Sequence, residues 1–135
     1  MKSQVDKVKV LVMDDDEAIR VMAWRMLDCL GCEVELVASG SEATERYKKF
    51  MQEGNPFDVV ILDLSIPGDL GGKETIAKLI EVNPAAKAIL SSGSDADPVF
   101  LNFRAFGFSA LLPKPYTLQE LEKTLQEVLL TLRKN

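Results

Sequence analysis

Polar side chains that can perform chemistry stand directly after several short apolar segments of this sequence. In chain order these residues are Asp14, Asp15, Asp63, Ser92 and Lys114. Carboxylates can hold a metal ion or attack an electrophile, whereas a lysine and a hydroxyl can bind phosphoryl oxygens. If the fold brings these residues together, the chemistry that they favour is phosphoryl transfer to Asp63.

Three of these residues are carboxylates, and a site that contained all of them would need positive charge. Two carboxylates at close range repel each other by roughly 4 kcal/mol at an effective dielectric constant of about 20. Lys114 offers one positive charge against three negative charges. Unless a carboxylate keeps its proton, a divalent cation has to supply the rest. Because the ligands are hard oxygens and too few for a full protein cage, we expect Mg²⁺ rather than Ca²⁺.

The segment around Asp63 indicates which elements position these residues. The apolar residues Val59–Leu62 lie between two aspartates and lead to a turn at Pro67, which is typical of a strand buried on both faces. We predict other strands over residues 8–13, 33–37, 88–92 and 109–112. We predict five helices, which begin near Asp16, Ser39, Gly72, Asp97 and Thr117. The fourth of these helices, over residues 97–106, has the weakest pattern.

This alternation of strands and helices predicts an α/β fold with a flavodoxin-like, doubly wound sheet of five parallel strands in the order 2-1-3-4-5. The carboxyl ends of all strands then lie at one edge of the sheet, where the polar residues converge. The second helix is expected to turn four side chains toward the core, namely Ala43, Tyr47, Phe50 and Met51.

Composition limits the remaining possibilities. The 135 residues are the size of one domain, 1–135, with a predicted core of 8–133 after a polar tail of residues 1–7. A net charge of −5 argues against nucleic-acid binding through a general positive field. No apolar run approaches the ~20 residues that span a bilayer, and the first residues lack an apolar signal core. We therefore expect no membrane segment and a cytoplasmic location.

The sequence contains no histidine, and its only cysteines are Cys29 and Cys32. A Ser-His-Asp or Cys-His nucleophile site and a histidine general base are therefore excluded. Two cysteines are too few for a structural zinc site, so we interpret them as a helix-end and a strand-start residue.

Four motifs make the chain similar to the receiver domains of response regulators in two-component signalling. They are Val-Leu-Val-Met-Asp14-Asp15-Asp16, Val-Val-Ile-Leu-Asp63-Leu-Ser-Ile-Pro67-Gly, Ile-Leu-Ser-Ser92-Gly93 and Pro-Lys114-Pro115-Tyr. The resemblance covers residues 8–133 and keeps the family's spacing between Asp63, Ser92 and Lys114. The residues around Ser92 and Lys114 also resemble receivers at the ends of hybrid sensor histidine kinases.

This resemblance implies a phosphorelay function without a separate turnover activity. Asp63 would accept a phosphoryl group from a histidine kinase or a histidine phosphotransfer domain. The residues implied to hold Mg²⁺ are Asp14, Asp15, Asp63 and, through its carbonyl, Ser65. Those implied to bind the phosphoryl group are Ser92, Gly93 and Lys114. A cis peptide bond is implied before Pro115.

The chain departs from the family at one position. Receivers usually carry a Tyr or Phe three residues before the lysine, and Leu111 stands there. Either the signal leaves through movement of the fourth helix, or the domain relays phosphate. By the resemblance, Ser65 and Ser94 occupy the positions that, in the family, position or obstruct the hydrolytic water. Both are small and uncharged, so we predict slow autodephosphorylation.

Several residues and functions keep two interpretations. Asp16 could be a metal ligand, but its place at a helix start favours capping. Ser91 competes with Ser92 for the hydroxyl role, and spacing favours Ser92. Trp24 lies outside the apolar stripe of its helix, either as a half-buried boundary residue or in a docking face for the kinase. The alternative functions are a haloacid-dehalogenase-like phosphatase, which would need an acid where Ser65 stands, and an FMN-binding module.

Overall fold

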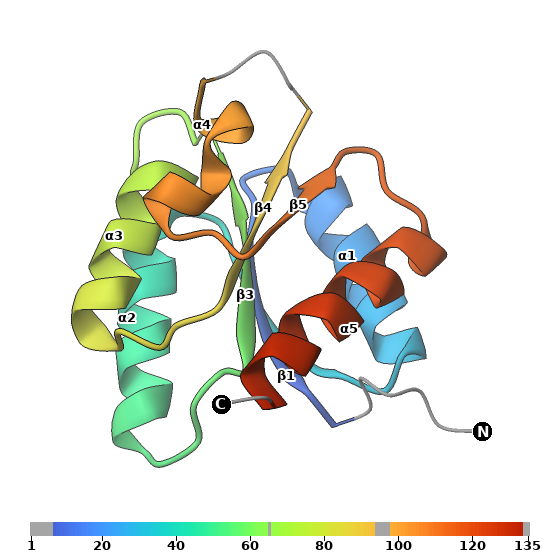
Figure 1. Cartoon of the computed structure of the whole chain (residues 1–135), viewed down its shortest axis with the longest axis horizontal. Coiled ribbons are helices and arrows are strands. Elements are labelled where there is room, and N and C mark those ends of the chain that lie inside the picture. The colour runs from blue at the N-terminus through green and yellow to red at the C-terminus, as the bar shows by residue number, and fades with distance from the viewer. Residues whose placement is uncertain (1–6, 65, 94–97, 134–135) are drawn as a thin grey trace.

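Five short strands form one parallel sheet in the order β2-β1-β3-β4-β5, which confirms the predicted order (Figure 1). The strands are β1 (Lys9–Met13), β2 (Glu33–Val37), β3 (Val59–Asp63), β4 (Ala88–Ser92) and β5 (Ala110–Pro113). The computed structural model describes residues 7–64, 66–93 and 98–133. Ser65 and Ser94 therefore lie outside the described residues, as does most of the predicted polar tail.

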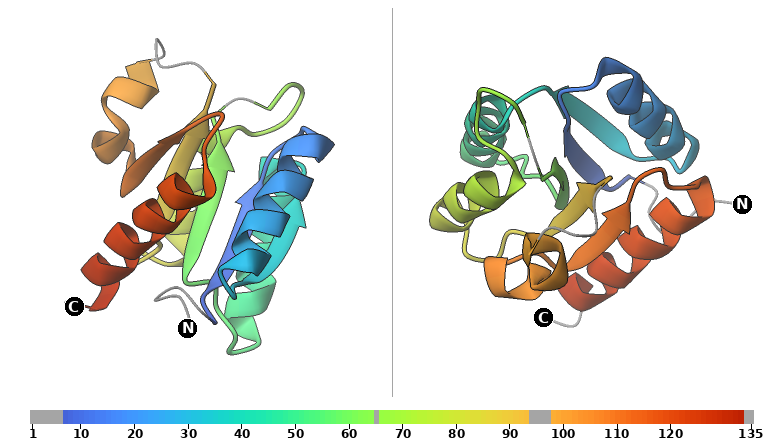
Figure 2. Two further views of the ribbon diagram at one scale, coloured as in Figure 1. Left: turned by 90° about the vertical axis from the view of Figure 1, so that its right-hand side faces the viewer. Right: turned by 90° about the horizontal axis from the view of Figure 1, so that it is seen from above.

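Helices cover both faces of the sheet, as the two views of Figure 2 show. They are α1 (Glu17–Cys29), α2 (Gly40–Gln52), α3 (Gly72–Val82), α4 (Pro98–Leu101) and α5 (Leu118–Arg133). Helices α1 and α5 pack on one face, whereas α2, α3 and α4 pack on the other. None of the helices that the structure describes has the length and apolar character required to cross a membrane.

The prediction of one continuous helix over residues 97–106 is wrong. Helix α4 ends at Leu101, and a 3₁₀ helix, η1 (Phe103–Phe106), follows it. At the break, Asn102 donates a side-chain hydrogen bond of 3.4 Å to the carbonyl of Pro98. Asn102 itself leaves the helical conformation, with φ of −120° and ψ of 35°. Gly107 then ends the segment with a φ of 103°, a conformation that favours glycine.

The sheet is buried because its central strands are apolar on both sides. All five residues of β3 and all five of β4 are buried, as is typical of covered parallel strands. Ala43 and Tyr47 of α2 are buried as predicted, but Met51 is 37% exposed. The prediction for Met51 was wrong because Phe50 and Phe57 close this end of the core, with ring centroids 4.7 Å apart.

Candidate functional site

Three carboxylates meet at the carboxyl edge of the sheet. Asp14 and Asp15 follow β1, and Asp63 is the last residue of the adjacent strand β3. Each offers a carboxylate oxygen, and these three oxygens all lie within 4.8 Å of one another. Asp14 and Asp63 are buried, at 3% and 8% exposure, whereas Asp15 is exposed. Two acids of the cluster are therefore buried at the edge of the sheet, and the third, Asp15, leaves the cluster open to solvent on one side.

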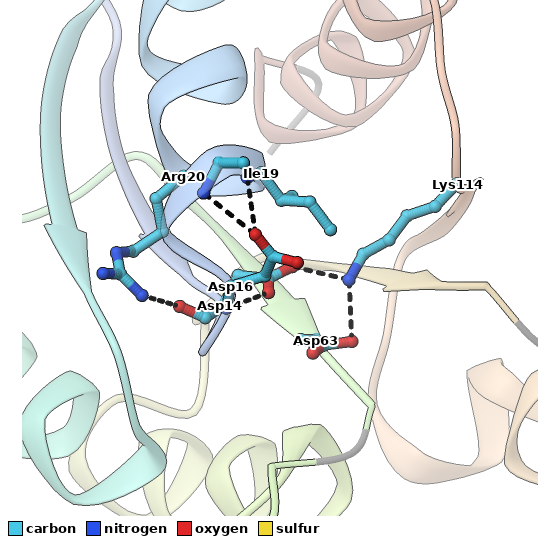
Figure 3. A network of polar contacts seen from close by, with 7 residues as sticks. Asp14, Asp16, Ile19, Arg20, Asp63 and Lys114 are labelled. Carbon is cyan, nitrogen blue, oxygen red and sulfur yellow. Dashed lines mark hydrogen bonds and ion pairs between the residues drawn. The ribbon is translucent and has the colours of Figure 1, made fainter.

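The ammonium group of Lys114 connects two of these carboxylates (Figure 3). Its Nζ lies 2.5 Å from Oδ2 of Asp14 and 3.1 Å from Oδ1 of Asp63. The backbone N–H of Lys114 donates to the carbonyl of Ser92, which fixes the start of the following loop on β4. The Lys114–Pro115 peptide bond is cis. Lys114 thus reaches from the β5 end of the sheet to β1.

Burial and charge shift the titration of these groups. Burial raises the pKa of the Asp63 carboxyl; Lys114 opposes this, and the negative charges of Asp14 and Asp15 add to it. Burial alone lowers the pKa of Lys114, but its hydrogen bond to Asp14 and the charge of Asp63 outweigh it, so the net pKa is raised. Burial, aided by Asp14, raises the pKa of Tyr116 to about 12. Lys114 is therefore protonated, and Asp14 and Asp63 both interact with its ammonium group.

The turn after β1 is held by several hydrogen bonds. The Asp16 N–H donates to Oδ1 of Asp14 at 2.9 Å. The Asp16 carboxylate accepts from the N–H groups of Ala18 and Ile19 at 2.9 and 3.2 Å, so Asp16 is the N-cap of α1. Arg20 donates a 2.6 Å hydrogen bond to the Asp14 carbonyl. Sequence reasoning missed Arg20; the only available signal was its place one turn into the helix that follows the acids.

The two serines of β4 lie differently. In the sheet register Ser91 is the partner of Asp63, and Ser92 is the partner of Pro113 at the end of β5. The buried Oγ of Ser91 has no hydrogen-bond partner among the described residues. Ser92 is 7% exposed and is followed by the exposed Gly93. Both hydroxyl candidates thus lie at the carboxyl end of β4, the strand adjacent to β3.

The chemistry of the donor set fits Mg²⁺. Asp14, Asp15 and Asp63 offer three hard, negatively charged oxygens at close range. The set is too small for a complete protein cage, which suits an ion that keeps several waters. The exposure of Asp15 leaves a path from solvent to the cluster.

An apolar surface adjoins the site on α1. Val21, Met22 and Trp24 are 40%, 49% and 43% exposed. A cavity of about 160 Å³ lies between this helix and the loop after β5; its lining residues are Ile19, Met22, Lys114, Pro115 and Tyr116. Trp24 is thus partly buried on a helix that borders the acidic cluster, and the geometry leaves its two interpretations open.

Comparison with known proteins decides the family. The family model described as the response regulator receiver domain matches residues 10–126. The chain belongs to the receiver domain family. This membership does not favour a haloacid-dehalogenase-like phosphatase or an FMN-binding module.

Curated relatives of this receiver domain are longer proteins. It is 34% identical to the sensor kinase CckA of Brucella abortus over 121 residues, which are 89% of this chain and 12% of that protein. It is 30% identical to the response regulator GacA of Pseudomonas aeruginosa over 122 residues, which are 90% of this chain and 55% of that protein. The receiver domain thus spans at most about half the length of these relatives.

Solved structures share the fold of this receiver domain. The chemotaxis protein CheY4 of Vibrio cholerae is 30% identical, with a TM-score of 0.80 over 90% of this chain and 98% of that chain. A receiver domain of a Pseudomonas aeruginosa sensor histidine kinase, described with a magnesium ion in its active site cleft, is 22% identical with a TM-score of 0.78, over 90% of this chain and 97% of that chain. The second likeness concerns the fold alone.

Proposed function

We propose that Asp63 of this receiver domain accepts a phosphoryl group from a partner phosphohistidine in an Mg²⁺-dependent reaction. The observation that carries this proposal is the bridge from Lys114 to Asp14 and Asp63, at 2.5 and 3.1 Å, within a cluster of three carboxylates. The Asp63 carboxylate lies beside the ammonium group of Lys114 and beside two acids, Asp14 and Asp15, that could bind a metal ion. This arrangement suits in-line attack of a carboxylate oxygen on phosphorus.

Each residue of the site has a defined task in this reaction. The ligands proposed for Mg²⁺ are Asp14, Asp15, Asp63 and the Ser65 carbonyl. When bound, Mg²⁺ would neutralise charge on the phosphoryl oxygens. A carboxylate oxygen of Asp63 attacks phosphorus while the phosphorus–nitrogen bond of the donor breaks, and the released imidazole nitrogen keeps the electron pair and takes up a proton. Lys114, the Ser92 hydroxyl and the Gly93 N–H stabilise the transferred group.

The partner proposed is a histidine kinase or a histidine phosphotransfer domain. The chain has no histidine, so the phosphohistidine must come from a different polypeptide segment. Trp24, which is 43% exposed on α1, the helix that follows the acids, would contact this partner. The likeness to the sensor kinase CckA supports a receiver that belongs to a sensor kinase. The arrangement that we propose is one receiver domain, residues 8–133, of a hybrid kinase, located in the cytoplasm.

The proposed product is long-lived, and the chain is not a separate turnover enzyme. Ser65 and Ser94 offer no charged group that could activate a hydrolytic water. Hydrolysis of the aspartyl phosphate should then be slow. A phosphorylated state that decays within seconds in the isolated chain would contradict this expectation.

Incubation with acetyl phosphate and Mg²⁺ tests the function. Mass spectrometry should show one labile adduct of about 80 Da, the mass of one phosphoryl group, on Asp63. Asp63→Asn should lose the adduct, whereas Asp69→Asn, the same change at an exposed aspartate, should keep it. Undiminished labelling of Asp63→Asn, or turnover of unrelated phosphate esters, would refute the proposal.

A further inference from the structure

Arg20 connects helix α1 to the peptide bond between the two consecutive acids of the site. Its Nη1 donates a hydrogen bond of 2.6 Å to the carbonyl oxygen of Asp14 (Figure 3). That carbonyl belongs to the planar peptide that joins Asp14 to Asp15. The hydrogen bond therefore fixes the plane of this peptide and the direction in which the Asp15 side chain leaves the backbone.

Asp14 has further restraints, whereas Asp15 depends on its backbone. The two carboxylate oxygens of Asp14 accept hydrogen bonds from the Asp16 N–H and from Lys114. Asp15 is exposed, and no group in the described parts of the chain donates a hydrogen bond to its carboxylate. Its place within the cluster is therefore set by the turn that carries it. Two side chains tie this turn to α1: Asp16 through its cap, and Arg20 through the Asp14 carbonyl, which is the contact next to Asp15.

We propose that Arg20 is a positioning residue for the acidic cluster, because it holds the Asp14–Asp15 peptide so that the Asp15 carboxylate stays beside Asp63. Arginine suits this task, since its planar guanidinium is always charged and presents several donors. The part of the proposal that concerns Mg²⁺ rests on the proposed function, whereas the contact itself is formed by the chain alone.

Removal of the Arg20 charge distinguishes a positioning role of this residue from a purely electrostatic one. A cation beside an acidic site repels a divalent metal ion, so loss of charge alone would tighten Mg²⁺ binding. Loss of positioning would let Asp15 leave the cluster and would weaken Mg²⁺ binding despite the reduced repulsion. The two roles thus predict changes in Mg²⁺ affinity of opposite sign.

The test uses Arg20→Met, Arg20→Lys and, as a matched control, Arg25→Met at an exposed position of the same helix. Calorimetry would measure the Mg²⁺ dissociation constant, and amide hydrogen exchange without metal would measure the mobility of residues 14–16. We expect Arg20→Met to weaken Mg²⁺ binding about tenfold, as for other residues that orient metal ligands, and to accelerate exchange. Arg20→Lys should lie between Arg20→Met and the wild type, and Arg25→Met should match the wild type.

Unchanged or tighter Mg²⁺ binding in Arg20→Met would overturn the proposal, whatever its exchange rates. Equal weakening in Arg25→Met would also overturn it, because the effect would then follow from general destabilisation of helix α1 and not from the contact with Asp14. Absence of Mg²⁺ binding in the wild-type chain would contradict the proposed function instead. The exchange measurement, made without metal, would still decide whether Arg20 holds the turn.

Discussion

Removal of the Lys114 charge tests the electrostatic balance of the site most directly. Lys114 contacts Asp14 and Asp63, and the three side chains are only 15%, 4% and 11% exposed. In Lys114→Met these two buried carboxylates would face each other and Asp15 without the lysine that neutralises them. Because Lys114 opposes the rise in the pKa of Asp63, its loss should also raise that pKa further.

The expected loss of stability follows from the burial of the pair. Removal of one partner of a buried ion pair lowers the free energy of unfolding by about 3–5 kcal/mol. The cluster is open to solvent at Asp15, so we expect a smaller loss, about 2 kcal/mol, without metal.

Mg²⁺ should reverse most of this loss. An ion present at about 100 times its dissociation constant stabilises the folded chain by about 2.7 kcal/mol. Lys114 no longer competes for the same oxygens in the variant, so Mg²⁺ should bind about tenfold more tightly, which adds about 1.4 kcal/mol. The difference in stability between wild type and Lys114→Met should thus fall below about 1 kcal/mol.

Urea denaturation with and without Mg²⁺ measures both changes. Lys123→Met removes the same charge at an exposed position of α5 and should stay within about 0.5 kcal/mol of the wild type. Phosphorylation of Lys114→Met by acetyl phosphate should be about 100-fold slower, since the phosphoryl oxygens lose a cationic donor. Equal stability of the two variants without metal, or a smaller gain from Mg²⁺ in Lys114→Met than in the wild type, would refute this reasoning.

Four further predictions concern Trp24, the two serines of β4 and Asp63. Trp24→Ala should slow phosphoryl transfer from a phosphohistidine partner but not from acetyl phosphate; equal slowing with both donors would reject the docking role. Ser91→Ala removes a buried hydroxyl that has no partner among the described residues, so it should leave stability unchanged or raise it by up to about 1 kcal/mol. Ser92→Ala, in contrast, should slow phosphorylation, and the opposite ranking of the two serines in phosphorylation rate would show that Ser91 supplies the hydroxyl. The pKa of Asp63 is higher in the folded state than in the unfolded state. Its protonation therefore contributes stability that is fully present below the unfolded-state pKa. This contribution is lost as pH rises through the folded-state pKa. In metal-free urea titrations the stability advantage of Asp63→Asn over wild type should therefore grow as pH rises through this range, and a pH-independent advantage would contradict the cause assigned to the shift.

The sequence was sufficient for those elements whose apolar pattern is continuous. Strand β3 reads as four apolar residues between aspartates, and a strand of this kind must be covered on both faces. The strand order then follows from short right-handed connections. The prediction of one helix over residues 97–106 failed because a local pattern does not show that the backbone leaves the helical conformation at Asn102. The prediction that Met51 is buried failed because the stacking of Phe50 on Phe57 is a tertiary contact, which the local pattern does not show.

Convergence of the acids with Lys114 could also be predicted, since parallel strands end at one edge. The capping of α1 by Asp16 was also predicted and is confirmed, but the other contacts within the site could not be predicted. Asp16 and Asp14 differ by two positions, yet one caps α1 and the other binds Lys114. The choice depends on the direction of each side chain in the turn, which the contact between Arg20 and the Asp14 carbonyl helps to set. Spacing along the chain carries no signal for such a contact.

Leu111 narrows the ways in which this receiver domain could transmit its state. A leucine has no polar group to exchange between two hydrogen-bonded positions, and Leu111 lies half-buried against the core on the face that α4 covers. The 3₁₀ helix η1 contacts β5, and α4, which precedes η1, has four residues, of which Val99 and Phe100 are buried. A helix this short gains little from its own hydrogen bonds and depends on those two contacts. Leu111 thus offers no polar side-chain switch on β5. Coupling through α4 would act through the packing of Val99 and Phe100, whereas a domain that relays phosphate would need no such coupling.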